Sequence, residues 1–160
     1  MKVERLMTKD VKTCGLEQSL AEAASLMWEG DCGCIPVVDA EGRAIGIITD
    51  RDICMAACFE GKTLRELSIG EAMAKQLLSC HPEDTIQHAE SIMRRAQVRR
   101  IPVVDAEGRI AGILSLNDVA REAEREKAAR APAVPLDDVA LTLSAVCRQR
   151  GPQAVAASAE

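Results

Sequence analysis

A hydroxyl and a carboxylate stand three residues apart at two places in this chain, Thr49 with Asp52 and Ser115 with Asp118. This spacing is that of a helix capping box, in which the two side chains satisfy backbone N–H groups at the start of a helix. The same arrangement suits a ligand, because a helix start offers N–H groups to a phosphate and a fixed carboxylate accepts from ribose hydroxyls. Two roles therefore stay open, capping alone or capping combined with nucleotide binding.

The two elements belong to an internal repeat. The sequence Ile-Pro-Val-Val-Asp-Ala-Glu-Gly-Arg occurs at 35–43 and again at 101–109, and an offset of 66 residues aligns the flanking segments without a gap. Gly46 and Gly112 also align, inside strand-like runs, where glycine indicates a close backbone approach or a bulge. The chain is therefore predicted to contain one unit used twice.

Each unit is predicted to have the order β-α-β-β-α. In the first unit, hydrophobic periodicity and turn residues predict an extended segment, a helix, two strands and a second helix at 11–14, 19–29, 35–38, 43–49 and 50–61. The second unit repeats this order at 77–80, 85–96, 101–115 (a hairpin) and from Leu116 onward. A sheet with helices on one side leaves its other face apolar, so this α/β (α+β) fold is expected to pack its two repeats by pseudo-two-fold symmetry.

Beyond the repeats, an alanine- and charge-rich helix is predicted to run to Arg130, before a proline-containing linker at 131–135. A last helix carries an apolar stripe expected to dock on the body or on another subunit: Leu136, Val139, Ala140, Leu143, Val146 and Cys147. The predicted domains are a first repeat at 1–66, a second at 67–123, a C-terminal helical extension at 124–150 and a disordered tail at 151–160.

The composition excludes several function classes. A formal net charge of −5 and only two aromatic residues, Trp28 and Phe59, disfavour nucleic-acid binding. The charged N-terminus lacks a signal-peptide core and no apolar run is long enough to span a membrane, so a cytoplasmic protein is expected. Both histidines, His81 and His88, are assigned to the surface, and no nucleophile with a base partner is evident, so the chain is not expected to be an enzyme.

The chain has seven cysteines, an odd number, and the default prediction is reduced thiols. They are interpreted as small core residues at repeat-equivalent or helical positions: Cys14, Cys80, Cys54, Cys58 and Cys147. The alternative to reduced structural thiols is a functional role, either a metal site formed by Cys32 and Cys34 with Cys80 and His81, or a redox switch. Neither shows the paired C-x2-C spacing typical of zinc sites.

The two units resemble a tandem of cystathionine β-synthase (CBS) domains, the Bateman module. The likeness covers roughly residues 3–123 and rests on the Leu-Met-Thr opening at 6–8, the Ile-Pro-Val-Val-Asp strands and the Gly-x-x-[Thr/Ser]-x-x-Asp element in both copies. In that family, clefts between paired domains bind AMP, ADP, ATP or S-adenosylmethionine. The resemblance implies a non-catalytic sensor that forms a homodimer and signals to a protein partner. A ligand-free assembly module is the alternative.

The resemblance also implies site residues. It assigns Thr49 and Asp52 to one cleft and Ser115 and Asp118 to the other. Further contacts are implied near the base and just before each Ile-Pro-Val-Val-Asp strand: Thr13, Ser79, Gly33, Cys34, Arg99 and Arg100. Because arginine binds phosphate bidentately and stays charged, the cleft that receives Arg99 and Arg100 is expected to prefer a phosphorylated nucleotide. Otherwise these arginines, with Arg94 and Arg95, form a solvated face or a partner contact.

Overall fold

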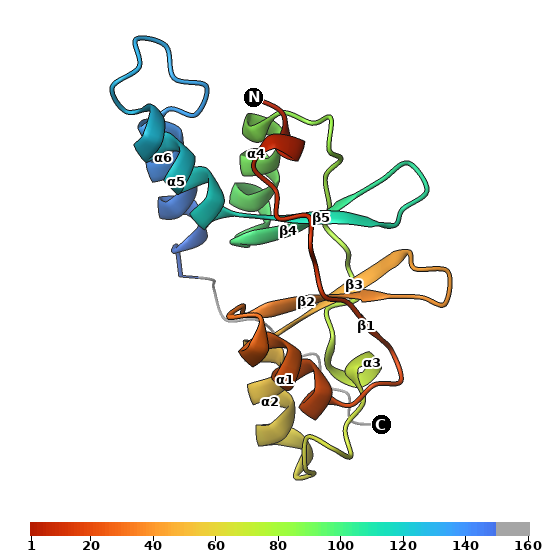
Figure 1. Cartoon of the computed structure of the whole chain (residues 1–160). Coiled ribbons are helices and arrows are strands. Elements are labelled where there is room, and N and C mark those ends of the chain that lie inside the picture. Colours follow the sequence, from red (N-terminus) through yellow and green to blue (C-terminus); the bar gives the residue numbers. More distant parts are fainter. Residues whose placement is uncertain (150–160) are drawn as a thin grey trace.

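The computed structural model describes residues 1–149 and shows two α+β units, one above the other in Figure 1. The first unit comprises β1 (Cys14–Gly15), α1 (Leu20–Glu29), β2 (Cys34–Val38), β3 (Ala44–Thr49) and α2 (Asp50–Glu60). Strand β2 pairs in parallel with β1 and antiparallel with β3. The predicted tail at 151–160 lies outside the described residues.

The second unit repeats this plan with α4 (Ile86–Ala96), β4 (Arg100–Val104), β5 (Ile110–Ser115) and α5 (Leu116–Glu126). Strands β4 and β5 form an antiparallel pair. The first strand is reduced here to a single parallel bridge between Cys80 and Val103, at the positions equivalent to Cys14 and Val37 in the first unit. The predicted α+β class and the two-repeat organisation are confirmed.

Helix starts follow the capping chemistry of the sequence. The Ser19 side chain accepts from the backbone of Glu22 and the Glu22 side chain accepts from the backbone of Ser19, which fixes the start of α1 as predicted. The Thr85 hydroxyl accepts from the His88 backbone at the start of α4. Gly61 adopts the left-handed conformation (φ 63°) directly after α2, so it ends that helix without steric cost.

The segment that precedes each repeat packs on the other unit. Helix η1 (Val3–Arg5) at the N-terminus buries Val3 in the second core, among Ile86, Ala89 and Leu114. Helix α3 (Ile69–Ala72), which follows the first repeat, contributes Ile69 to the first core. Each hydrophobic core therefore contains a side chain from outside its own β-α-β-β-α unit, a crossing that the repeat pattern did not reveal.

Two glycines allow these crossing segments to approach the hairpins. A Cβ atom on Gly46 would lie 2.7 Å from the carbonyl oxygen of Ala74, and one on Gly112 would lie 2.7 Å from the carbonyl oxygen of Thr8. Beside them, Ala74 pairs with Ile47 and Thr8 pairs with Ile113 in antiparallel bridges. Close backbone approach is thus the reason for both glycines.

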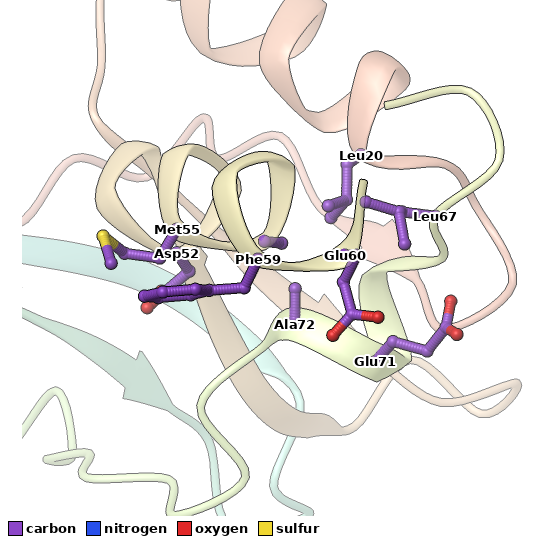
Figure 2. A pocket seen from close by; sticks show the side chains of 9 residues that line it. Leu20, Asp52, Met55, Phe59, Glu60, Leu67, Glu71 and Ala72 are labelled. Carbon is purple, nitrogen blue, oxygen red and sulfur yellow. The ribbon is translucent and has the colours of Figure 1, made fainter. Parts of the chain in front are cut away.

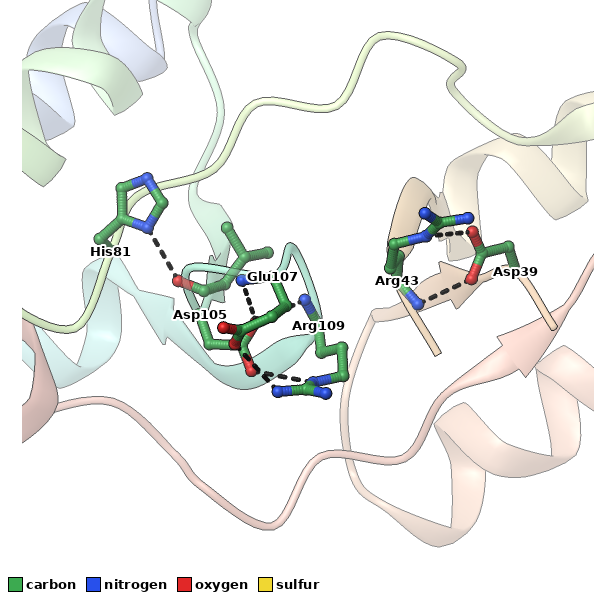
Figure 3. Close-up of polar contacts among 7 residues, drawn as sticks. Asp39, Arg43, His81, Asp105, Glu107 and Arg109 are labelled. Atoms are coloured by element: carbon green, nitrogen blue, oxygen red, sulfur yellow. Dashed lines mark hydrogen bonds and ion pairs between the residues drawn. The ribbon is translucent and has the colours of Figure 1, made fainter. Parts of the chain in front are cut away.

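The hairpin turns of the two units meet. Arg43 and Arg109 form an antiparallel bridge, and the Ala44 backbone N–H donates to the Gly108 carbonyl. Each arginine binds the aspartate of its own turn, Arg43 with Asp39 at 2.8 Å and Arg109 with Asp105 at 3.0 Å (Figure 3). The neighbouring arginines are therefore each neutralised within their own turn. Nearby, His81 Nδ1 lies 3.0 Å from the Val104 carbonyl oxygen.

The C-terminal helix α6 (Leu136–Val146) docks on α4 and α5 of the second unit. Arg94 donates to the hydroxyl of the fully buried Thr142 at 2.9 Å, and that hydroxyl lies 3.1 Å from the carboxylate of the buried Glu90. Burial raises the pKa of Glu90. The contact with the body is therefore centred on a polar group rather than on the predicted apolar stripe.

The predicted stripe on α6 divides between two environments. Val139 and Val146 are half-buried and Val139 packs against the second core, whereas Leu136 and Leu143 stay exposed at 49% each. The preceding helix ends at Glu126 instead of continuing to Arg130. The Glu126 carboxylate accepts from the backbone N–H groups of Ala133 and Val134, which turns the chain back toward α6. The domain boundaries at 66 and 123 remain predictions.

Replacing Gly46 or Gly112 with alanine is expected to lower the free energy of unfolding by about 1–3 kcal/mol, because the new methyl group would overlap backbone oxygen. Urea unfolding measures the effect. Gly15→Ala is the matched control, since nothing lies within 4 Å of its Cβ position. Equal stability of all three variants and the parent would contradict close approach as the role of these glycines.

Candidate functional site

Thr49 and Asp52 lie where β3 becomes α2. The Thr49 hydroxyl lies 2.6 Å from Asp52 Oδ2 and accepts from the Asp52 backbone N–H at 3.2 Å. The Thr49 backbone N–H donates to the same carboxylate oxygen at 2.9 Å. The capping role is therefore present. It engages only one of the two carboxylate oxygens.

Ser115 and Asp118 repeat this geometry where β5 becomes α5. The Ser115 hydroxyl lies 2.5 Å from Asp118 Oδ2, and the Ser115 backbone N–H donates to that oxygen at 3.0 Å. The second oxygen, Asp118 Oδ1, accepts from Arg121 at 2.5 Å. Both oxygens of Asp118 are thus engaged within the unit.

The two elements differ because position 121 corresponds to Met55 in the first unit. Methionine cannot donate a hydrogen bond, and among the described residues Asp52 Oδ1 has no hydrogen-bond donor. Asp52 therefore offers a carboxylate oxygen to a ligand without first breaking an ion pair, whereas Asp118 does not.

The residues just before the hairpins come together across the two units. A Cβ atom on Gly33 would lie 2.9 Å from Asp50 Oδ2 and 3.5 Å from Arg100 Nη1, so the Arg100 guanidinium reaches the first unit. Cys34 is buried next to this group, and burial raises the pKa of its thiol to about 11. Positive charge from the second repeat therefore lies beside the helix start that carries Thr49 and Asp52.

The other predicted site residues are more dispersed. Thr13 and Arg99 are exposed, and Ser79 is half-buried in the segment that leads to Cys80. Ser79 lines an open hollow of about 560 Å³ with Leu77, Leu78 and the end of α4. Its volume falls in the range of small-molecule sites.

Asp52 lines a second hollow, of about 200 Å³, between α1, α2 and α3. Figure 2 shows Met55 and Phe59 of α2 on the left, Leu20 and Leu67 at the upper right, and the carboxylates of Glu60 and Glu71 at the lower right. This hollow is smaller than a typical nucleoside site. The described residues thus bring Thr49, Asp52, Cys34 and Arg100 toward one region, but no single hollow contains all the predicted contacts.

The cysteines divide into two groups. All seven are free; Cys14, Cys34 and Cys80 are buried, and the others are exposed. The interpretation of Cys54, Cys58 and Cys147 as core residues is wrong, because α2 buries only Ile53 and α6 turns Cys147 outward. Within residues 1–149, no three histidine, cysteine, aspartate or glutamate side chains are placed to hold a metal ion. The proposed cluster of Cys32, Cys34, Cys80 and His81 is therefore not assembled.

The comparisons with known proteins identify the family. A CBS domain model matches residues 3–58 and again residues 69–125. The chain belongs to the CBS domain family. It is 36% identical over 118 residues to the CBS domain-containing protein YhcV of Bacillus subtilis, covering 74% of this chain and 82% of that protein. The two matches correspond to the two structural units.

Two solved structures show how closely the architecture agrees. The CBS domain pair of protein MJ0100, in complex with 5′-methylthioadenosine and S-adenosylmethionine, superposes with a TM-score of 0.69 at 28% identity, covering 76% of this chain and 94% of that chain. Hypoxic Response Protein I with two coordinated zinc ions gives a TM-score of 0.69 at 30% identity, covering 76% and 98%. Among the described residues of this chain, no helix has the length and apolar character needed to cross a membrane.

Sequence reasoning missed two residues of the candidate site, Arg121 and Asp50. The signal for Arg121 was present, since an arginine three residues after an aspartate lies on the same helix face. Its counterpart Met55 showed that the two copies differ there. Asp50 gave no such signal, because its position beside Gly33 and Arg100 depends on how the units pack.

In the folded protein at pH 8, iodoacetamide is expected to modify Cys32, Cys54, Cys58 and Cys147 and to spare Cys14, Cys34 and Cys80. The spared thiols are buried, and pKa values of about 11, 11 and 12 leave roughly one in a thousand or fewer ionised. Peptide mass spectrometry gives the pattern, and labelling in urea, where all seven react, is the control. Rapid labelling of folded Cys34 would show that the region around it opens.

Proposed function

We propose that the protein is a non-catalytic, cytoplasmic regulatory module that binds an adenosine-containing ligand between its CBS repeats and signals by changing their relative arrangement. The observation that carries the proposal is the pair of Thr/Ser-x-x-Asp elements, held at the starts of α2 and α5 in the geometry described above. The MJ0100 domain pair, at 28% identity, holds S-adenosylmethionine and 5′-methylthioadenosine. AMP, ADP, ATP and S-adenosylmethionine are the candidate ligands.

The ligand chemistry follows from the groups present. The carboxylate of Asp52 accepts hydrogen bonds from both ribose hydroxyls through the oxygen that capping leaves open, and Thr49 lies beside it at the helix start. Arg100, which reaches Gly33, provides positive charge for a phosphate or for the carboxylate of S-adenosylmethionine. Thr13 and Cys34 border the base in this proposal, and Ser79 and Arg99 serve the second cleft with Ser115 and Asp118.

Signalling requires that the ligand bind one arrangement of the repeats more tightly than another. Arg100 belongs to the second repeat and lies beside residues of the first, so a ligand held by Arg100 and Asp52 couples the two units. A homodimer and an effector protein in trans are the proposed recipients of this change.

Titrating AMP, ADP, ATP and S-adenosylmethionine by calorimetry is expected to give binding by at least one of them. The midpoint temperature of thermal unfolding should rise in parallel, because ligand at 100 times its Kd stabilises the fold by about 2.7 kcal/mol. Asp52→Ala is expected to weaken binding in the first cleft about 10- to 100-fold, the loss of one or two charge-assisted hydrogen bonds. Asp118→Ala tests the second cleft in the same way.

A capping-box carboxylate outside the clefts provides the control. Glu22→Ala removes the same kind of cap from α1, so it reproduces the loss of helix stability without touching a cleft. Binding that is unchanged in both aspartate variants would overturn the site assignment. Loss of affinity in Glu22→Ala equal to that in Asp52→Ala would show that only fold stability was changed.

Two single substitutions, each replacing Arg121 or Met55 with the residue at the equivalent position of the other repeat, test the difference between the clefts. Arg121→Met is expected to strengthen binding at the second cleft by up to about fivefold, because it releases Asp118 Oδ1 from an exposed ion pair. Met55→Arg places an arginine three residues after Asp52 and is expected to weaken the first cleft by a similar factor. Calorimetry on both variants measures the change, and equal affinities in all forms would contradict the role of the second carboxylate oxygen.

A further inference from the structure

A row of polar side chains on α4 and its C-cap holds α6 on the second unit. The row has the spacing i, i+3, i+7 and i+10, which places its members on one side of the helix: Gln87, Glu90, Arg94 and Gln97. The amides at its two ends donate to carbonyl groups of the C-terminal segment, that of Ala133 at 3.0 Å and that of Ala145 at 3.1 Å. Between them, Glu90 and Arg94 both contact the hydroxyl of Thr142. Hydrogen bonds therefore run along the whole of this contact.

The internal repeat shows that this polar row is particular to the second unit. An offset of 66 residues relates its members to two alanines, the single tryptophan and one aspartate: Ala21, Ala24, Trp28 and Asp31. Glu90 itself corresponds to Ala24, which has no ionisable group. Helix α6 packs on α4 and α5, in the same unit as the row. The buried carboxyl of Glu90 therefore belongs to the contact with α6 and not to the common plan of the two repeats.

The centre of this contact lacks one hydrogen when Glu90 is ionised. Glu90 is 1% exposed and Thr142 is fully buried. The Thr142 hydroxyl accepts from Arg94 at 2.9 Å. Its oxygen also lies 2.9 Å from the Asp138 carbonyl oxygen and 3.1 Å from Glu90 Oε1. A hydroxyl has one hydrogen to donate, and here two oxygen atoms compete for it. A proton on Glu90 ends this competition, because the carboxyl then donates to Thr142 while Thr142 donates to Asp138.

We propose that Glu90 is a proton-dependent latch for α6: the protonated carboxyl holds the helix on α4 and α5, and loss of the proton to solvent loosens it. In the protonated state, the one hydrogen and both lone pairs of the Thr142 hydroxyl are used. After ionisation, either the Glu90 carboxylate or the Asp138 carbonyl oxygen loses its bond to that hydroxyl. This loss costs free energy only while α6 is docked, because water reaches the carboxylate once the helix moves away. The inference does not depend on which ligand the clefts bind.

The groups around Glu90 set the direction of the pH dependence. Burial is the main cause that raises the pKa of the Glu90 carboxyl, and the Asp138 carboxylate of α6 adds to it. The Thr142 hydroxyl and Arg94 act in the opposite direction without reversing the shift. On α5, the Glu126 carboxylate binds backbone N–H groups ahead of α6, and the buried side chains are apolar: Leu116, Val119 and Ala123. The docked state therefore binds the proton more tightly than the released state. Docking is strongest at low pH and weakens as the pH rises through the docked-state pKa of Glu90.

Hydrogen–deuterium exchange with peptide mass spectrometry, on the full chain from about pH 5 to about pH 8, tests the latch. Dividing the exchange rate of an unstructured chain at each pH by the measured rate gives protection factors. The protection of α6 is expected to fall as the pH rises, by up to about tenfold per pH unit, and to level off above the docked-state pKa of Glu90. Glu90→Gln is expected to keep α6 protected at every pH, because its amide donates to Thr142 and does not ionise. Glu124→Gln, which changes an exposed carboxylate on α5, is the matched control and should follow the parent.

Other outcomes overturn the proposal. Protection of α6 that is constant across this range, or that falls equally in the parent and in Glu90→Gln, shows that Glu90 does not control docking. A fall that extends to peptides of α1 is global unfolding and contradicts a local latch.

Asp138→Asn keeps the test decisive if Glu90→Gln loses the protection of α6 at every pH. The substitution removes a negative charge that raises the pKa of Glu90, and it leaves the Asp138 backbone carbonyl in place. The loss of protection should therefore be smaller and should level off at a lower pH than in the parent. An unchanged profile, or a shift to higher pH, overturns the latch.

Discussion

The fold depends on the exchange of segments between the two repeats. Each core is completed by residues that come from outside its own repeat, Val3 in the second core and Ile69 in the first. The exchange requires backbone to pass against backbone at Gly46 and Gly112, where no side chain fits. Neither core is complete without a segment from outside its own β-α-β-β-α unit. The region between the repeats, where Arg100 approaches Gly33, is therefore formed by residues of both units.

Duplication supplies two similar Thr/Ser-x-x-Asp elements, and a few substitutions make them different. Asp52 and Asp118 occupy equivalent positions and cap equivalent helices. Arg121 occupies one oxygen of Asp118, whereas Met55 leaves the corresponding oxygen of Asp52 open. Arg100 reaches toward the first unit. The first element thus combines an available carboxylate with a nearby cation, which is the chemistry proposed for a nucleoside carrying an anionic group.

The same positions distinguish the outer surfaces. Helix α5 is charged on its outer side and packs beside α6, while α2 exposes Met55 and Phe59. Helix α6 covers the outer helices of the second unit, whereas the outer helices of the first unit expose apolar side chains. The two units of the duplicated chain therefore differ in their outer surfaces.

The sequence by itself determined the repeats, the strand and helix order, and the capping boxes, because these depend on local spacing: Ser19 starts α1 and Gly61 ends α2 as predicted. It also identified the CBS family. Only the tertiary structure decided which unit receives Val3 and Ile69, which side of α6 is buried, and that Arg100 lies beside Gly33. These features depend on contacts between residues far apart in the chain. Periodicity predicts the apolar side of a helix. The side of α6 that docks on the second unit instead carries the buried Thr142, which is hydrogen-bonded to Glu90 and Arg94.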